Sequence, residues 1–181
     1  MKPLQPYRIP FSGLKTGKHQ FEYEIDHLFF DQFVYSIVKN GRLRAAVELE
    51  KQETFIILQF HIFGEIELNC DRCLANYFHK IDIKERLIVK FGEDKNWDDD
   101  TEEVIVLTKN DYEIDVSLPL YEYITVAVPY VTRCEDVEGV SSCDQEMMNK
   151  LKTLSNKAHK QSKDDAMDPR WDALKQIINK N

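Results

Sequence analysis

Residues 54–70 constrain the fold more than any other segment, because their apolar side chains alternate with the period of a β-strand. Every second residue is apolar, and these residues are Ile56, Leu58, Phe60, Ile62, Ile66, Leu68 and Cys70. The opposite positions are partly apolar in the first half and mostly polar in the second. The pattern predicts one long strand, bent or bulged at Gly64.

Shorter segments with the same period flank this strand. Residues 43–49 come before it, and the polar residues 50–53 are short enough for a hairpin turn. The pattern returns in residues 81–91, after the cysteine pair that ends the long strand. Further strands are expected near residues 21–25 and 104–106. The sequence therefore predicts a β-rich antiparallel sheet or partial barrel.

The period changes in the second half of the chain. Ser117 is expected to cap a helix with Pro119 in its first turn and with Leu120, Ile124 and Val128 on one face, and this helix should cover the sheet. Residues 144–154 indicate another short helix. The fold class is then α+β, with a domain over residues 1–154, a polar linker over 155–167 and a C-terminal amphipathic helix over 168–181.

The C-terminal helix has a strong start, with Asp168 as its cap and Pro169 at its first position. Its apolar stripe consists of Trp171, Leu174, Ile177 and Ile178. So short a helix is not stable alone in water and must pack on something. Either the stripe closes the domain's own core or it docks on a partner, with Arg170, Trp171 and Leu174 as the contacts.

Bulk composition favours a globular protein of the cytoplasm. Hydrophobic residues make up 43% of the 181 residues and charged residues 31%, which argues against wholesale disorder. The first residues are interrupted by prolines and lack the apolar core of a signal peptide, and no run has the length of a membrane span. The net charge of −8 means that any contact with nucleic acid must come from a local basic surface.

Four cysteines carry the strongest chemical signal. They form two pairs, Cys70-x2-Cys73 at the end of the long strand and Cys134-x8-Cys143 farther on. Together they would supply the four thiolates that a structural zinc ion favours, and a reducing compartment makes metal ligation likelier than disulfides. The alternative is that Cys70 is a core-facing thiol and the other three are incidental.

Enzymatic functions are not expected. A zinc deaminase needs a His-x-Glu before its Cys-x-x-Cys, and none of the histidines upstream of Cys70 has a glutamate two residues later. The six glycines form no phosphate-binding loop, and the β-rich surroundings of Cys70 do not suit a redox motif of the thioredoxin type.

Two groups of basic residues are candidate RNA contacts. Lys80, Lys84, Arg86 and Lys90 share one face of the strand that follows the cysteines, and Arg72 lies inside the cysteine motif. Lys150 and Lys152 begin a second group that continues to Lys163 without an intervening acid. Such faces bind phosphates, although a solvated outer strand face and a soluble linker would show the same patterns.

Three segments together resemble the YceD family, the large ribosomal RNA subunit accumulation proteins of bacteria. They are the Gly64 strand running into Cys70-Asp71-Arg72-Cys73-Leu74, the Tyr112-Glu113-Ile114-Asp115 stretch before the Leu118-to-Pro129 helix, and Asp168-Pro169-Arg170-Trp171 with Leu174. The resemblance implies a role in accumulation or processing of large-subunit ribosomal RNA, with that RNA or pre-ribosomal particles as partners. It implies no reaction.

Two hypotheses of function follow. In the first, the protein is a non-enzymatic accessory factor that binds RNA or pre-ribosomal particles through its local basic face. In the second, it is a protein-interaction module with a structural zinc site, whose net negative charge suits a basic ribosomal protein or an assembly factor.

Overall fold

The computed structural model describes residues 7–92, 104–108, 110–134 and 143–161. Its elements in chain order are β1 (Arg8–Ile9), β2 (Gly17–Ile25), α1 (His27–Phe30), β3 (Gly41–Lys51), β4 (Phe55–Asn69), β5 (Asn76–Phe91), β6 (Val104–Leu107), β7 (Ile114–Asp115), α2 (Ser117–Val126) and α3 (Gln145–Gln161). Strands β2 to β6 form a five-stranded sheet in the order of the chain, and β1 pairs with β7. This is the predicted α+β class, with an open sheet whose edges are β2 and β6.

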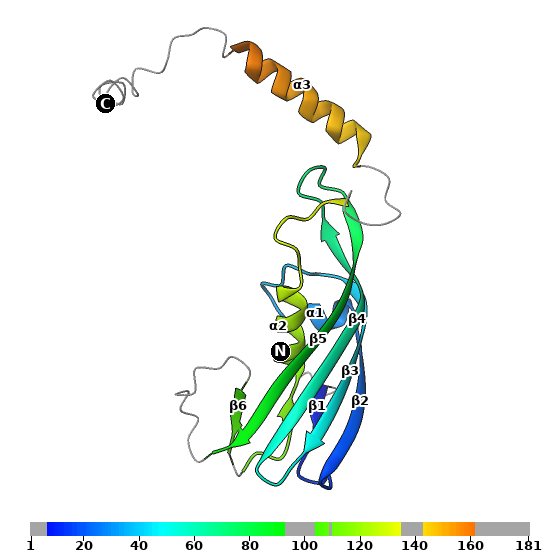
Figure 1. Ribbon diagram of the computed structural model, residues 1–181. Helices are drawn as coiled ribbons and strands as arrows, with labels where there is room; N and C mark the ends of the chain where they lie inside the picture. Colours follow the sequence, from blue (N-terminus) through cyan, green and yellow to red (C-terminus); the bar gives the residue numbers. More distant parts are fainter. Residues whose placement is uncertain (1–6, 93–103, 109, 135–142, 162–181) are drawn as a thin grey trace, which may run out of the picture.

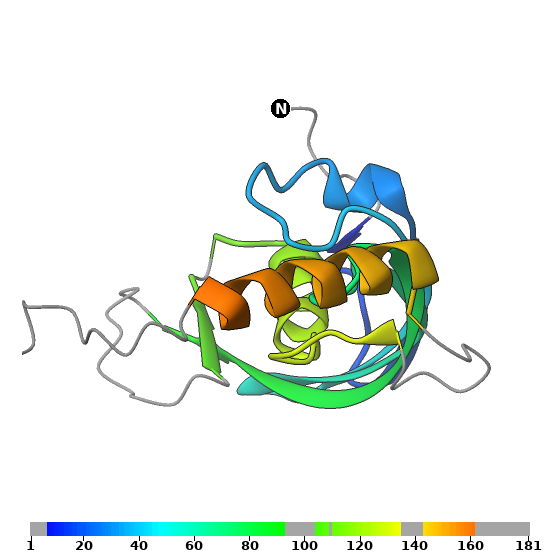
Figure 2. The ribbon, with the colours of Figure 1, turned by 90° about the horizontal axis from the view of Figure 1, so that it is seen from above.

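The five-stranded sheet is curved, and its concave side holds the core (Figures 1 and 2). The apolar positions of the sequence pattern are the buried positions of β4. Ile56, Leu58, Phe60 and Ile62 are buried, while Gln59 between them is exposed. Strands β2 to β5 are antiparallel as predicted. The prediction fails for β6, which runs parallel to β5. A local pattern of apolar residues does not show the direction in which a strand runs, so the sequence could not predict that β6 is parallel to β5.

Helix α2 lies on the concave side of the sheet, where the sequence places it (Figure 2). Its Leu120 and Ile124 are fully buried, and the Tyr123 ring meets Phe60 of β4 edge-on with centroids 5.3 Å apart. The predicted cap is wrong. Ser117 is the first helical residue, its N–H donates to Asp115 Oδ1 over 2.9 Å, and the cap position is held by Val116 without a side-chain hydrogen bond.

Gly64 lies inside β4 without a bulge, contrary to one of the two predicted alternatives. The register pairs residues one to one on both sides of it, with Leu43 of β3 and Ile81 of β5 opposite Gly64. Its φ is +139°, and a Cβ atom placed there would lie 2.2 Å from the Arg42 carbonyl oxygen. A glycine is therefore needed because β3 approaches β4 closely at this position, and not because β4 contains the extra residue of a bulge.

Three short elements that the sequence did not predict close the open side of the core. Asp26 caps α1 by accepting from the Leu28 N–H over 2.9 Å, and the helix buries Phe29 and Phe30. Strands β1 and β7 pair two residues each. These elements are too short for a period in hydrophobicity to reveal them.

Helix α3 is longer than the sequence predicts. It continues to Gln161 rather than ending at Leu154, so it takes in the first residues of the segment predicted as a linker. The polar residues after Leu154 lack an apolar stripe, which is why the pattern missed them. The C-terminal helix predicted for 168–181, with Arg170, Trp171 and Leu174, lies outside the described residues. Within the described ranges, no helix is long and apolar enough to cross a membrane.

The substitution Gly64→Ala tests the close approach of β3 and β4. The new Cβ would meet the Arg42 carbonyl oxygen at 2.2 Å with a backbone φ that side chains rarely adopt. We expect the free energy of unfolding to fall by at least about 2 kcal/mol, measured by chemical denaturation.

Gly13→Ala is the matched control, because a Cβ atom at Gly13 meets nothing within 4 Å. It should change the free energy of unfolding by no more than about 0.5 kcal/mol. Equal effects of the two substitutions would contradict the close approach at Gly64.

Candidate metal centre

The first cysteine pair occupies the turn between β4 and β5, which we call the cysteine hairpin (residues 70–75). The strands pair up to Asn69 and Asn76, and the Cys70 N–H then donates to the Ala75 carbonyl over 2.9 Å. The Leu74 N–H donates to the Cys70 carbonyl over 2.9 Å, and Leu74 itself has a φ of +62°. This left-handed residue turns the chain back, so Cys70 and Cys73 both point inward and are buried.

The second pair reaches the hairpin through a hydrogen-bonded clasp between Asp71 and Thr132. The Asp71 N–H donates to the Thr132 carbonyl, and the Thr132 N–H donates to Asp71 Oδ2, both over 2.8 Å. The Thr132 hydroxyl also donates to the Asn69 carbonyl over 2.6 Å. The clasp joins residues far apart in the chain and places Cys134, two residues after Thr132, against the hairpin.

Cys143 is positioned by the start of α3. Asp144, the next residue, accepts the Met147 N–H on its carboxylate over 2.8 Å and the Met148 N–H on its carbonyl over 3.0 Å. These bonds satisfy donors that a helix start leaves without partners. Met147 and Met148 pack against the core, so the capped start of α3 fixes Cys143 beside the other three cysteines.

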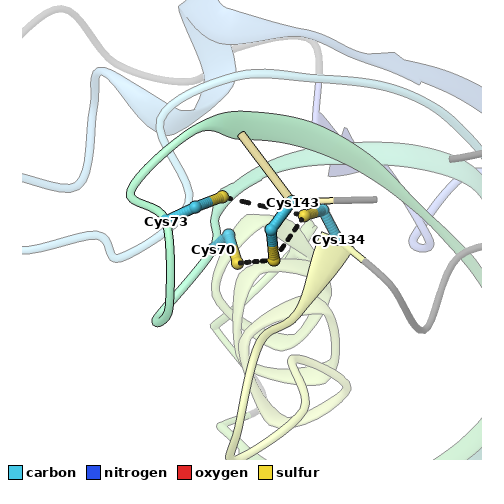
Figure 3. Close-up of side chains that lie close together, drawn as sticks. All are labelled: Cys70, Cys73, Cys134 and Cys143. Atoms are coloured by element: carbon cyan, nitrogen blue, oxygen red, sulfur yellow. Dashed lines mark hydrogen bonds between the residues drawn. The ribbon is translucent and has the colours of Figure 1, made fainter. Parts of the chain in front are cut away.

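The four sulfur atoms converge on one point (Figure 3). Their separations are 3.9 Å for Cys70 and Cys143, 3.8 Å for Cys73 and Cys134, and 3.4 Å for Cys134 and Cys143, and all four lie within 4.8 Å of one another. Four thiolates bound to zinc at about 2.3 Å would sit about 3.8 Å apart at the corners of a tetrahedron. The separations of 3.4–3.9 Å are close to that spacing, and the sulfurs are too far apart for disulfides.

The backbone of the site favours a negative charge on sulfur. Burial opposes ionisation of Cys70, but the backbone N–H groups of Cys134, Cys73 and Arg72 hydrogen-bond its sulfur and together lower the pKa of Cys70 to about 6. Burial raises the pKa of Cys134. Cys70 therefore ionises easily, whereas Cys134 ionises only with difficulty. A divalent metal ion would stabilise the thiolate form of all four cysteines and balance their negative charge.

The candidate RNA contacts fall into separate places. Lys80, Lys84, Arg86 and Lys90 share the outer face of β5, the face away from the core, and we call them the basic strip. Arg72 is exposed in the cysteine hairpin from which β5 begins. Lys150 and Lys152 are exposed on α3, which leads away from the sheet (Figure 1), and Lys150 is paired with Glu146 over 2.6 Å. The structure does not bring α3 into the basic strip.

Two sets of residues near these sites were not singled out from the sequence. Asp71 lay inside the cysteine motif, but nothing local connects it with Thr132, so the clasp had no sequence signal. Phe63 and Phe78 lie on the same outer face as the basic strip. The outward direction of Phe78 could have been predicted, because Phe78 lies on the same even-numbered face of its strand as Lys80 and Lys84.

Comparison with known families gives one result. The model of the family described as large ribosomal RNA subunit accumulation protein YceD matches residues 58–178, more than half of the chain. No curated protein and no solved structure matches the chain. The family match covers most of β4, the cysteine hairpin, the basic strip, α2 and both cysteine pairs. The chain belongs to the YceD family of large ribosomal RNA subunit accumulation proteins.

Proposed function

We propose that this chain is a cytoplasmic, non-enzymatic accessory protein that promotes accumulation and processing of large-subunit ribosomal RNA by binding RNA or pre-ribosomal particles. The family description supplies the ribosomal RNA. The observation that carries the binding is the basic strip, a row of cations on an exposed strand face of a protein whose net charge is −8. A structural zinc ion at the four cysteines completes the proposal.

The basic strip suits phosphate binding because the charges of Lys80, Lys84 and Arg86 are available. Within the described part of the chain, no carboxylate forms an ion pair with Lys80, Lys84 or Arg86. The acid on the same strand face, Asp82, accepts a hydrogen bond from His61 Nε2 over 2.8 Å. A cation that has no ion-pair partner within the protein can neutralise a phosphate directly. The counterions that the phosphate releases then contribute to the binding free energy.

The zinc proposal rests on the close approach of the four sulfur atoms and on their burial. Four thiolates fill the coordination shell of zinc, which leaves no open position for water or substrate. Such a centre stabilises a fold and performs no reaction. It would tie the cysteine hairpin to the chain after α2 and to the start of α3.

A second candidate function is a protein-interaction module for a basic ribosomal protein or an assembly factor. The loop between α1 and β3 favours it, because Val34, Tyr35 and Ile37 are 72%, 94% and 63% exposed. The loop is anchored by Phe33, whose ring stacks on Tyr121 with centroids 3.9 Å apart, and by buried Ser36 and Val38. An exposed apolar surface is typical of protein contacts. Association with ribosomal particles that survives nuclease treatment would favour this function over RNA binding.

Metal content tests the zinc proposal. Protein purified without chelator should contain about one equivalent of zinc per chain by elemental analysis, since the site has one closed set of four ligands. Removal of the metal by a chelator should lower the melting temperature. Cys70→Ser should abolish stoichiometric metal and lower the melting temperature of the untreated protein.

Two results would remove zinc from the account. One is the absence of metal from protein prepared without chelator. The other is a Cys70→Ser variant that loses the same modest stability with and without chelator, because that behaviour belongs to a core thiol.

The clasp gives an independent prediction, because Asp71 is not one of the four clustered residues that could hold the metal. Asp71→Ala removes the carboxylate that accepts the Thr132 N–H and should weaken zinc binding by about tenfold, measured by competition with a chromophoric chelator. Asp31→Ala, at an exposed position beside α1, is the matched control and should leave zinc affinity unchanged. If the two variants hold zinc equally well, the clasp does not organise the site.

The basic strip is tested in cells from which the gene has been deleted. Deletion should lower mature large-subunit RNA relative to small-subunit RNA, and the wild-type gene should restore the ratio. The double variant Lys84→Gln, Arg86→Gln should fail to restore it, because it removes two phosphate contacts. The readout is the ratio of the two RNAs on a denaturing gel.

The control has the same change in charge at exposed lysines away from the strip, Lys15→Gln with Lys39→Gln, and should restore the ratio. An unchanged ratio in the deletion cells would remove the ribosomal role. Equal restoration by both double variants would remove the basic strip from it.

A further inference from the structure

Exposed aromatic rings accompany the basic strip on the outer face of β4 and β5. Phe63 of β4 is 40% exposed and Phe78 of β5 is 41% exposed, although the opposite face of both strands holds the apolar core. The register places Phe63 opposite Asp82, between the rows of Lys80 and Lys84. Phe78 lies on β5 two residues before Lys80. Rings and cations therefore alternate on one surface.

The spacing of these side chains follows from the register. Opposed residues of an antiparallel pair have Cβ atoms about 5 Å apart, and diagonal neighbours lie about 7–8 Å apart. The row of Phe78 and the row of Phe63 are four residues apart, which is about 13 Å along the strands. The row between them holds Lys80 opposite Glu65. One cation thus lies between two rings, and Lys84 and Arg86 continue the path beyond Phe63.

Phe63 stands between two depressions of the surface. One, of about 430 Å³, is lined by residues of β2 and β3 that include Glu22, Glu24 and Arg44. The other, of about 360 Å³, is lined by Lys80 and Asp82 on the β5 side. The His61 ring lies next to Phe63, with centroids 5.1 Å apart. A flat group thus has room beside the Phe63 ring, in the depression next to Lys80 and Asp82.

Cations of the outer face lie on β5 and at Arg42 and Arg44 of β3, the latter opposite Phe63, and acids lie beside them at Glu65 and Glu67 of β4. The outer face of β2 carries Glu22 and Glu24, which repel phosphates, whereas the outer face of β5 carries the basic strip. Bases in a duplex are already stacked on one another, so exposed rings offer them little. Unpaired bases gain from stacking on aromatic side chains, and every base has a face that can stack.

We infer that the outer face of β4 and β5 is a platform for single-stranded RNA, on which bases stack on Phe63 and Phe78 while Lys80, Lys84 and Arg86 hold the phosphates. The inference rests on the proposed RNA-binding function and deepens it by naming the form of the RNA. It selects unpaired segments of the ribosomal RNA, as expected for RNA that has not yet finished folding.

The test uses the purified full chain and a fluorescein-labelled RNA of about a dozen nucleotides, alone or annealed to its complement. Wild-type protein should bind the single strand more tightly than the duplex by fluorescence anisotropy. Phe63→Leu with Phe78→Leu should weaken single-strand binding by about tenfold or more, because stacking is lost. Tyr112→Leu, an exposed aromatic position just before β7, is the control and should bind as wild type.

The conservative variant Phe63→Trp with Phe78→Trp keeps an aromatic ring at both positions. It distinguishes a loss of stacking from a loss of folding. It should bind the single strand at least as tightly as wild type, and RNA should quench its added tryptophan fluorescence. Lys84→Gln with Arg86→Gln should weaken binding of either RNA and reduce the salt dependence of the single-strand affinity, by about 0.7 in slope for each lost phosphate contact.

The possible failures are distinguishable. If the leucine double variant binds the single strand as well as Tyr112→Leu, or if the duplex is preferred, the platform is overturned while RNA binding by the basic strip stands. If wild-type protein binds neither RNA, both the platform and the proposed RNA-binding function are overturned, and the protein-interaction function takes their place.

Discussion

The structure depends on the uninterrupted pairing of β4 with β5. The register runs without an inserted residue from Phe55 opposite Lys90 to Asn69 opposite Asn76. Side chains alternate between the two faces of a strand, so a slip of one residue would exchange the core face with the outer face. The pairing therefore fixes three features together: the apolar concave face, the basic strip with its aromatic rings, and the position of the cysteine hairpin at the end of the two strands.

The cysteine centre connects this hairpin with the rest of the chain. The strands β4 and β5 extend beyond the last residues paired with β3, and no other strand within the described residues pairs with their far end. The clasp between Asp71 and Thr132 and the convergence of four buried sulfur atoms supply that support. A metal ion there would cross-link segments that lie far apart in the chain, and a cross-link that closes a long loop constrains the unfolded state most. The basic strip begins directly after this fixed point.

Much of the fold was predictable, because a long strand with one buried face has a clear period in its sequence. The strands of residues 43–49 and 54–70 were found this way, as was α2 from Leu120 and Ile124. Elements fixed by distant partners were not predictable. The parallel direction of β6, the pairing of β1 with β7 and the cap of α2 depend on contacts that no local pattern records.

The candidate site was predictable to the same extent. Cys70 and Cys73 are a recognisable pair, but the spacing of Cys134 and Cys143 is not specific, and only the fold shows that all four sulfurs meet. No local sequence pattern indicates the contact between Asp71 and Thr132, because the two residues lie far apart in the chain. The outward direction of the basic strip followed from alternation, whereas the position of Phe63 between Lys80 and Lys84 required the register of β4 against β5.

The most direct test of the account is ultraviolet cross-linking of the protein to RNA in its own cells, followed by mass spectrometry of the cross-linked peptides and sequencing of the RNA. We expect large-subunit ribosomal RNA attached to peptides of β4 and β5, at Phe63, Phe78 and the basic strip. Cross-links confined to α3 or to the loop after α1, or no enrichment of large-subunit RNA, would contradict it.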